Sequence, residues 1–204
     1  MQDPTFPTPT RRELRRQERR HIIVQTARRA FLEKGYAATS MSSIAEAMGG
    51  SKSTLWSYFR SKEDLFTAVV ETETAGIRTE ITDVLATSRD LGTGLLRFCQ
   101  IYLRAIESPE ALTAIRIAAG ESLLSPELGM IFYKQAQLPA EEALAHFLGR
   151  HTHALRDVAV EKMARTLTSL CTSRQLPLLL GYCEVPAVEA APEFTDHFLR
   201  IYRV

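Results

Sequence analysis

Cysteine is scarce in this chain of 204 residues, which has only Cys99, Cys171 and Cys183. None of them forms a CxxC pair, and an odd number excludes a complete set of disulfides within the chain. We therefore expect the thiols to be small core residues of a protein in the reducing cytoplasm. No apolar run approaches the roughly 18 residues of a membrane span, and the N-terminus lacks the pattern of a signal peptide, so no membrane partner is expected.

Catalytic and metal-binding patterns are missing as well. The segment 120–122 (Gly-Glu-Ser) lacks the second glycine of a nucleophile elbow, and the sequence contains no glycine-rich phosphate loop. His146, His151 and His153 are clustered, but no carboxylate or cysteine stands near them at metal-ligand spacing. We expect exposed or capping histidines there rather than a zinc site. The sequence therefore predicts a protein that is not an enzyme and needs no cofactor.

The formal net charge of +1 is unevenly distributed. Residues 1–70 contain 12 Lys and Arg against 7 Asp and Glu, whereas residues 71–204 contain 13 against 17. Six arginines fall between Arg11 and Arg20. Taken alone, this segment can be a solvated helical extension, but a basic N-terminal third on an acidic remainder indicates a polyanionic partner at that end. Residues 1–10 contain three prolines and are expected to be a disordered leader.

Apolar residues recur at helical spacing along the chain, and the alternation typical of strands is absent. The first helix is expected to begin at Arg12 or later and to end at Lys34, because Ile23, Ala27 and Phe31 form one apolar stripe. Gly35 follows at a position that suits a helix C-terminus. The pattern continues helix after helix, so we expect an all-α fold.

Two short helices follow the first one, at 41–48 and 52–59. Ser40 and Ser51 are good N-caps for them, and Gly49-Gly50 forms a tight connection. Two short helices joined by a glycine turn behind a longer packing helix are typical of a helix-turn-helix. The second short helix contains no acidic residue, as expected of a helix that approaches phosphates.

These segments resemble the DNA-binding domain of the TetR family of bacterial repressors. The motifs that carry the resemblance are TARRAFLEKGY at 26–36, TSMSSIAEAMG at 39–49, SKSTLWSYF at 51–59 and KEDLF at 62–66. Two positions depart from the family pattern. Gly50 stands where an apolar residue is usual, and Trp56 stands where tyrosine is commonest, so we expect the same docking mode on a different preferred operator.

The resemblance implies a set of contacts with double-stranded DNA. The residues expected to contact the phosphate backbone are Thr39, Ser40, Thr54, Tyr58 and Lys62. Those expected to face base edges or the adjoining backbone are Lys52, Ser53, Trp56 and Ser57. Simple capping is the alternative for Thr39 and Ser40, although capping and a phosphate contact can coexist. Packing within the small core is the alternative for Trp56 and Tyr58. The arginine run is then expected to be a flexible arm along phosphates or in a minor groove.

The remainder of the chain resembles the AefR-like subgroup of the family's ligand-binding domains. The similar segments are IYL at 101–103, IRIAAGE at 115–121, SPEL at 125–128 and FLRIY at 198–202. This resemblance implies operator binding as a homodimer, released when a small hydrophobic effector binds. The expected organisation is a leader and basic arm at 1–20, a helix-turn-helix domain at 21–66, and a helical ligand-binding and dimerisation domain at 67–204.

Aromatic and aliphatic residues at helical spacing are candidates for the effector cavity that the family places among these helices. The candidates are Phe98, Tyr102, Ile106, Ile115, Arg116, Phe132 and Tyr133. An ordinary core is the alternative for the apolar residues. A surface pair with Glu121 is the alternative for Arg116.

The last two long helices carry a second set of apolar residues. In the resembling proteins this pair of helices forms a four-helix dimer interface. The residues expected there are Met163, Leu167, Leu170, Phe194, Phe198 and Ile201. An intramolecular core is the alternative. The predicted protein is thus a cytoplasmic, ligand-responsive repressor, and the rival function is an effector-independent or architectural DNA-binding factor.

Overall fold

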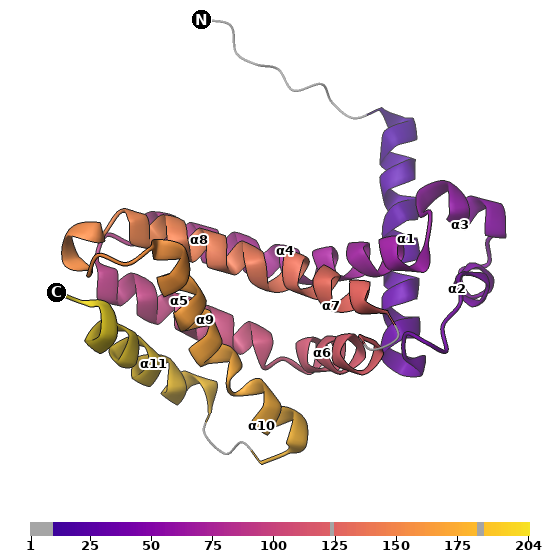
Figure 1. Cartoon of the computed structure of the whole chain (residues 1–204). Coiled ribbons are helices and arrows are strands. Elements are labelled where there is room, and N and C mark those ends of the chain that lie inside the picture. The colour runs from indigo at the N-terminus through magenta and orange to yellow at the C-terminus, as the bar shows by residue number, and fades with distance from the viewer. Residues whose placement is uncertain (1–9, 123–124, 183–185) are drawn as a thin grey trace, which may run out of the picture. The chain divides into compact units, whose positions relative to one another are not determined.

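The computed structural model describes residues 10–122, 125–182 and 186–204 (Figure 1). Within these ranges the regular structure is helical, apart from one isolated bridge between Leu155 and Arg203, and the all-α prediction is confirmed. The expectations for residues 1–9 and Cys183 lie outside the described residues. The helices are α1 (Arg11–Lys34), α2 (Met41–Ala47), α3 (Lys52–Tyr58), α4 (Lys62–Thr87), α5 (Leu91–Ile106), α6 (Pro109–Glu121), α7 (Pro126–Phe132), the π-helix η1 (Tyr133–Gln137), α8 (Leu138–Gly149), the 3₁₀-helix η2 (Thr152–Ala154), α9 (Val160–Thr172), α10 (Gln175–Leu180) and α11 (Ala187–Tyr202).

The chain separates into two compact units. The first ends at Val69 and the second begins at Val70, so the boundary falls within α4. None of the helices in the described ranges combines the length and the apolar character needed to cross a membrane.

The first unit begins with a helix that is longer than the apolar stripe alone requires. Thr10 and Glu13 form a capping box: the Glu13 N–H donates to the Thr10 hydroxyl at 3.3 Å, and the Thr10 N–H donates to Glu13 Oε2 at 2.7 Å. Arg, Leu, Glu and Gln in the next turns are all good helix formers. The flexible arm expected over the arginine run is therefore wrong for residues 11–20, which form the first turns of α1.

Aromatic side chains join the elements of the first unit. Phe66 of α4 makes edge contacts with Phe31 and Tyr36, with ring centroids 5.8 and 5.4 Å apart. Leu55 of α3 and Ile44 of α2 are completely buried. Because these two short helices each anchor on an apolar side chain, their opposite faces remain open to solvent.

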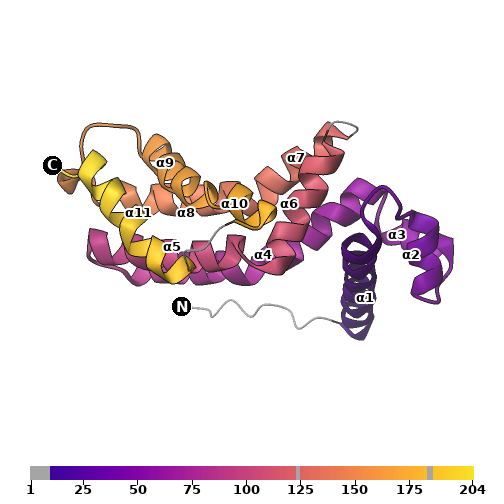
Figure 2. The ribbon, with the colours of Figure 1, turned by 90° about the horizontal axis from the view of Figure 1, so that it is seen from below.

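The second unit has a densely packed part, which we call the dense half. It consists of α5, α8, α9, α11 and the C-terminal part of α4, and α5 lies beside α11 (Figures 1 and 2). Phe98, Phe147 and Phe198 are completely buried in it. Gly94 is required at one close approach, since a Cβ there would lie 2.2 Å from the Phe147 ring.

The other part of this unit, which we call the open half, consists of α6, α7, η1 and α10. Among its described residues only Ala118 and Leu128 are buried. Most of its other apolar side chains, such as Ile115, Phe132 and Leu178, are half-buried, and Met130, Leu176 and Leu180 are exposed. Apolar side chains left in this intermediate state have surface available for a further apolar group.

Candidate nucleic-acid interface and effector site

The exposed face of α3 carries the four residues that were expected to face bases. Ser51 caps the helix by accepting a hydrogen bond from the Thr54 N–H at 3.1 Å, and Leu55 fixes its inner face. Lys52, Ser53, Trp56 and Ser57 are all exposed, with Trp56 exposed to 51%. In the structure, Trp56 therefore does not pack within the small core, which was the alternative to its role in DNA binding. The face presents hydroxyl, ammonium and indole groups without an acid.

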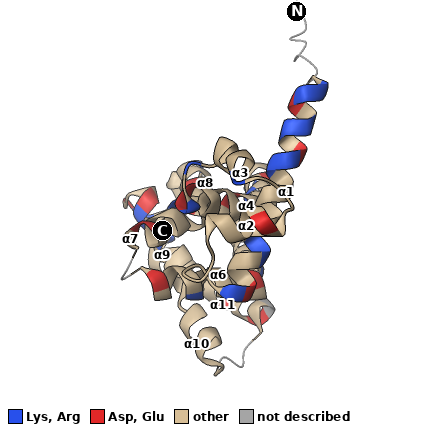
Figure 3. Ribbon diagram, turned by 90° about the vertical axis from the view of Figure 1, so that its right-hand side faces the viewer, with Lys and Arg blue, Asp and Glu red and all other residues tan. Residues whose placement is uncertain are grey.

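Arginines of α1 lie against this helix and the turn before it. The Arg16 guanidinium is 5.9 Å from the Tyr58 ring centroid, and that of Arg20 is 5.3 Å from the Phe59 ring centroid. Arg19 fills the space beside Gly50, where a Cβ would lie 2.7 Å from Arg19 Nη2. The missing side chain at position 50 thus admits a cation into the turn. The basic bands of α1 are visible towards its N-terminal end in Figure 3.

Three of the predicted phosphate-contact residues lie at accessible positions. Thr54 is half-buried, with its Oγ1 2.9 Å from the Ser51 hydroxyl, and Tyr58 is half-buried beside Arg16. Ser40 is exposed and caps α2 by accepting from the Ser43 N–H at 3.0 Å.

Thr39 is buried at the end of α1. The residue is only 1% exposed, and its hydroxyl lies 2.7 Å from the Gly35 carbonyl and 3.2 Å from the Ala30 carbonyl. The side chain is turned into the end of α1, as its capping alternative describes, and its contact with a phosphate stays a prediction.

Lys62 is also engaged within the protein. Its Nζ donates to the carbonyls of Tyr36 at 2.9 Å and Thr39 at 3.0 Å, and it stands 4.0 Å from the Tyr36 ring centroid. The Tyr36 hydroxyl in turn donates to Glu63 Oε1 at 2.9 Å. These contacts attach the segment between α1 and α2 to the start of α4. Sequence reasoning missed them because they join positions 23 or more residues apart.

The effector candidates fall into three groups. Phe98 and Tyr102 are buried in the dense half, and their rings stack 5.3 Å apart. Arg116 is exposed on α6. The half-buried candidates are Ile106, Ile115, Phe132 and Tyr133. Only this last group presents partly open apolar surface, and the structure gives Phe98 the core role that was its alternative.

A buried carboxylate that sequence reasoning missed lies beside two of these candidates. Glu141 of α8 is 5% exposed and accepts hydrogen bonds from Tyr133 and Gln137 of η1 and from Thr168 of α9. Burial, and then the nearby Cys171 and Glu141, raise the pKa of Tyr102 above its ordinary value. A signal was available: Glu141 shares the helical stripe of Leu144 and Leu148, where an acid is unexpected.

The other buried polar groups of this unit are paired or inert. Arg174 Nε lies 2.5 Å from Glu107 Oε1, with side chains only 10% and 13% exposed. Cys99 and Cys171 are buried and free, as expected for core thiols. A hydrogen bond with Cys99, together with burial, raises the pKa of Cys171, so its reactive thiolate form is suppressed.

The histidine cluster lies in and after the last turn of α8. His146 and His153 are exposed, whereas His151 is 9% exposed and its ring packs against Phe147, with centroids 4.7 Å apart. Burial, and then Arg150, lower the pKa of His151. In the described ranges, no group of three His, Cys, Asp or Glu side chains is placed to hold a metal ion.

Half of the predicted dimer residues face the interior of their own chain. Met163, Leu167 and Phe198 are at most 1% exposed and belong to the dense half. Their predicted contact with a partner is wrong, because the more apolar stripe of each helix packs within the unit. Ile201 is 47% exposed. Leu170 and Phe194 are half-buried at the edge of the core.

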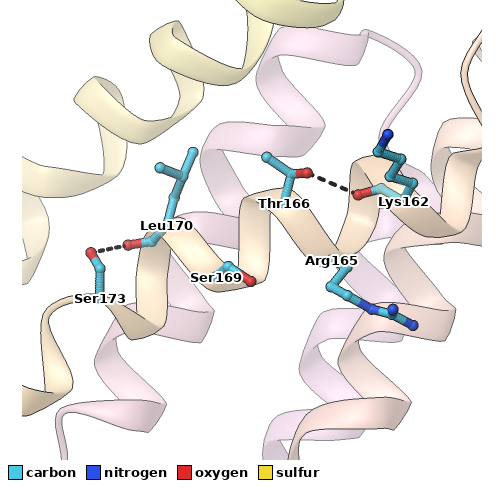
Figure 4. A pocket seen from close by; sticks show the side chains of 6 residues that line it. All are labelled: Lys162, Arg165, Thr166, Ser169, Leu170 and Ser173. Atoms are coloured by element: carbon cyan, nitrogen blue, oxygen red, sulfur yellow. Dashed lines mark hydrogen bonds between the residues drawn. The ribbon is translucent and has the colours of Figure 1, made fainter.

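The outer face of α9 forms a shallow hollow of about 420 Å³ (Figure 4). It is lined by Lys162, Arg165, Thr166, Ser169, Leu170 and Ser173. The lining residues come from one helix face and are mostly polar. This polar stripe, and not the buried apolar stripe that contains Met163 and Leu167, is the part of α9 that another surface can cover.

Two family models match the sequence. Residues 23–69 match the model described as bacterial regulatory proteins, tetR family, and residues 93–204 match that of the AefR-like transcriptional repressor, C-terminal domain. The second match alone covers more than half of the chain. Both resemblances seen in the sequence are confirmed.

Individual proteins agree with these matches. Over 92 residues the chain is 36% identical to the uncharacterized HTH-type transcriptional regulator Rv1255c of Mycobacterium tuberculosis, a stretch that covers 45% of this chain and 46% of that protein. Over 77 residues it is 34% identical to the HTH-type transcriptional activator FasR of Mycolicibacterium smegmatis, covering 38% and 35% of the two chains. The chain thus spans less than half the length of the curated relatives it matches.

Solved structures cover more of the chain. The flavonoid-responsive regulator FrrA is 30% identical, with a TM-score of 0.77, over 92% of this chain and 98% of FrrA. A structure described as a TetR-family transcriptional regulator from Mesorhizobium loti is 23% identical, with a TM-score of 0.79, over 96% of this chain and 100% of its own. The latter similarity shows the fold.

Proposed function

The chain belongs to the TetR family of bacterial regulatory proteins, and on that premise we propose that it is a homodimeric repressor released from its operator by a small hydrophobic effector. It is a DNA-binding transcriptional regulator. The observation that carries the proposal is the exposed, acid-free face of α3 flanked by the arginines of α1. The protein would act in the cytoplasm, where bacterial DNA lies.

Operator binding can be tested after genomic footprinting has located the operator. If each protomer neutralises three or more phosphates, affinity should fall by roughly 10³ or more between 50 and 200 mM salt. Lys52→Ala should weaken operator binding more than binding to random DNA, because base contacts carry the specificity. Lys34→Ala removes the same charge from the last turn of α1, about 27 Å along the helix from Arg16. This control should change neither the affinity for the operator nor the affinity for random DNA. Equal losses on both DNAs would reject base reading by Lys52.

The homodimer is proposed to use the outer faces of α9 and α11. The support is the hollow along α9, which Leu170 lines, and the half-buried Phe194 and exposed Ile201 of α11, a helix that packs against α9. A two-fold dimer matches a pseudo-palindromic operator. Ile201→Glu should shift the protein towards monomer in analytical ultracentrifugation. Met130→Glu alters a similarly exposed apolar residue on α7 and should leave the protein dimeric. A dimer that survives Ile201→Glu but dissociates in Met130→Glu would reject this surface.

Effector binding is supported by the partly open apolar side chains of the open half. FrrA, which covers nearly the same length, is flavonoid-responsive, so flavonoids are the first compounds to try. A ligand at 100 times its dissociation constant should stabilise the folded protein by about 2.7 kcal/mol. If no compound stabilises the folded protein, the result would favour the rival function, an effector-independent DNA-binding factor.

The direction of regulation needs its own assay. The C-terminal match is to a repressor domain, whereas FasR is an activator. Transcription in vitro from the footprinted promoter, with and without the protein, should show repression. Increased transcript would instead identify an activator.

A further inference from the structure

Glu141 is a charged group in a place that ordinary packing does not require. It lies in the first turn of α8, at the border between the dense half and the open half, and is 5% exposed. Removing a carboxylate from water costs several kcal/mol unless hydrogen bonds and an opposite charge compensate for it. The hydrogen bonds and the opposite charge around Glu141 therefore decide whether the cost of burying its carboxylate is fully compensated.

The two oxygens of Glu141 are unequally compensated. Oε1 accepts from Gln137 Nε2 at 2.9 Å and lies 3.2 Å from the Thr168 hydroxyl, whose single proton is shared with a main-chain carbonyl at 3.1 Å. Among the described residues, Oε2 has only the Tyr133 hydroxyl at 3.3 Å and Arg165 Nε at 3.8 Å. The Arg165 side chain is 67% exposed, so its charge is largely screened by water.

A carboxylate oxygen can accept two good hydrogen bonds. At 3.3 Å the hydroxyl contact to Oε2 is longer than the usual 2.5–3.0 Å for O–H···O bonds. Oε2 of Glu141 therefore retains capacity for a further, shorter donor. This oxygen is the one on the side of Tyr133, which belongs to the open half.

The local backbone also departs from regular structure at this point. Tyr133 and Gln137 are the first and last residues of the π-helix η1, and both donate to Glu141. Short π-helical turns are rare and frequently occur at functional sites. Phe132, which directly precedes η1, contributes half-buried apolar surface. An acceptor with spare capacity beside apolar and aromatic side chains is the usual composition of a small-molecule site.

We propose that Glu141 is the polar recognition group of the effector site, and that the effector is an aromatic molecule with a phenolic hydroxyl that donates to Oε2. The inference rests on the proposed function and specifies its effector. A carboxylate in an apolar site repels an anion, so fatty acids and other carboxylic acids are disfavoured ligands. The aromatic part of the effector would contact Phe132 and Tyr133, and its hydroxyl would complete the hydrogen bonds of Glu141.

The test uses three probes on the full-length protein: naringenin, its fully O-methylated derivative and dodecanoate. Calorimetry should show naringenin binding at least about tenfold more tightly than the methyl ether, because a hydrogen bond to a charged group is lost. In Glu141→Gln, naringenin should bind about tenfold more weakly, and dodecanoate should bind more tightly than to the wild type. Glu142→Gln changes the exposed neighbouring acid and should leave all three affinities unchanged.

A second variant guards against a folding defect in the first. Tyr133→Phe removes the hydroxyl that now donates to Oε2 and leaves this oxygen less compensated, so naringenin should bind a few times more tightly while the methyl ether is unaffected. An unchanged ratio of the two ligands in Tyr133→Phe, or an unchanged ratio in folded Glu141→Gln, would overturn the assignment.

The outcomes also separate this inference from the proposed function. Wild-type protein that binds the operator and releases it with dodecanoate, but not with naringenin, would refute the phenolic effector and keep the ligand-responsive repressor. Wild-type protein that binds the operator and none of the probes would refute the phenolic effector as well. Failure to bind any footprinted DNA would refute the proposed function itself.

Discussion

Replacing Lys62 with methionine should destabilise the first unit while leaving the electrostatic part of DNA binding intact. The Lys62 ammonium donates to the Tyr36 and Thr39 carbonyls at 2.9 and 3.0 Å and stands 4.0 Å from the Tyr36 ring centroid. Methionine keeps the length and the apolar stem but cannot donate a hydrogen bond. The substitution therefore removes the contacts that attach the segment before α2 to α4.

The size of the effect follows from these contacts. Hydrogen bonds to a charged group contribute about 1.5–3 kcal/mol each, and a cation over an aromatic ring about 0.5–1 kcal/mol at an exposed site. Lys62 is half-buried and water can replace it at the two carbonyls, so we expect a total of about 2 kcal/mol rather than the full sum. Trp56, the only tryptophan, lies in α3 of the same unit and reports its unfolding in urea. The midpoint should fall by about 1–2 M.

The salt dependence of operator binding distinguishes this structural role from the phosphate contact that the family resemblance implied. Loss of a phosphate contact would lower the slope of log affinity against log salt by about 0.9 per copy. We expect the slope of Lys62→Met to equal that of the wild type. Lys34→Met, at the exposed end of α1, is the control and should cost less than about 1 kcal/mol. A reduced slope with an unchanged urea midpoint would show that Lys62 acts on DNA and not on the fold.

Three further predictions concern the second unit. Gly94→Ala should lower the calorimetric unfolding temperature by roughly 5–10 °C, because its Cβ would lie 2.2 Å from the fully buried Phe147 ring; an unchanged temperature would mean that the ring moves freely. Arg174→Leu alone should cost about 3–5 kcal/mol in urea unfolding, because it leaves the Glu107 carboxylate buried without the guanidinium, and adding Glu107→Leu should recover part of this loss. The lowered pKa of His151 means that folding favours its neutral form, so its contribution to stability is complete above the unfolded value of about 6.5 and is lost as the pH falls through the lower folded value. Thermal unfolding between pH 7 and 5 should therefore decline less in His151→Asn than in the wild type, and parallel declines would contradict this.

The helix-turn-helix could be predicted closely because its signals are local. Ser40 and Ser51 cap the helices assigned to them, and Gly49 has the positive φ of 62° that the tight connection requires. Caps and glycine turns act within four residues, so one sequence suffices to find them. The Thr10–Glu13 capping box is equally local and was overlooked, which is why the start of α1 was expected as an arm.

The roles that were predicted wrongly depend on contacts between distant positions. Periodicity identifies the apolar stripe that contains Met163 and Leu167, but it does not say whether the same chain or a second copy covers that stripe. The stripe in fact packs in the dense half. Thr39 and Lys62 have side chains suited to phosphates, and the fold directs both to main-chain carbonyls. Residue type and position in a motif therefore indicate what a side chain can bind, and the fold selects among the possibilities.

The contrast between the two halves of the second unit bears on the choice between a ligand-responsive regulator and an architectural factor. A body that only dimerises gains stability from every apolar side chain that it buries fully. The dense half meets this expectation, whereas α6, α7, η1 and α10 leave most of their apolar side chains half-buried. In the same region a π-helix interrupts regular hydrogen bonding, and Glu141 places a charge on an apolar stripe. Each of these features lowers the stability of the free protein, and a bound molecule that fills the apolar surface and donates to Glu141 would reverse all three. Local conflicts with good packing are expected at functional sites and not in a purely structural core, so their concentration in one region favours a body that is completed by its effector.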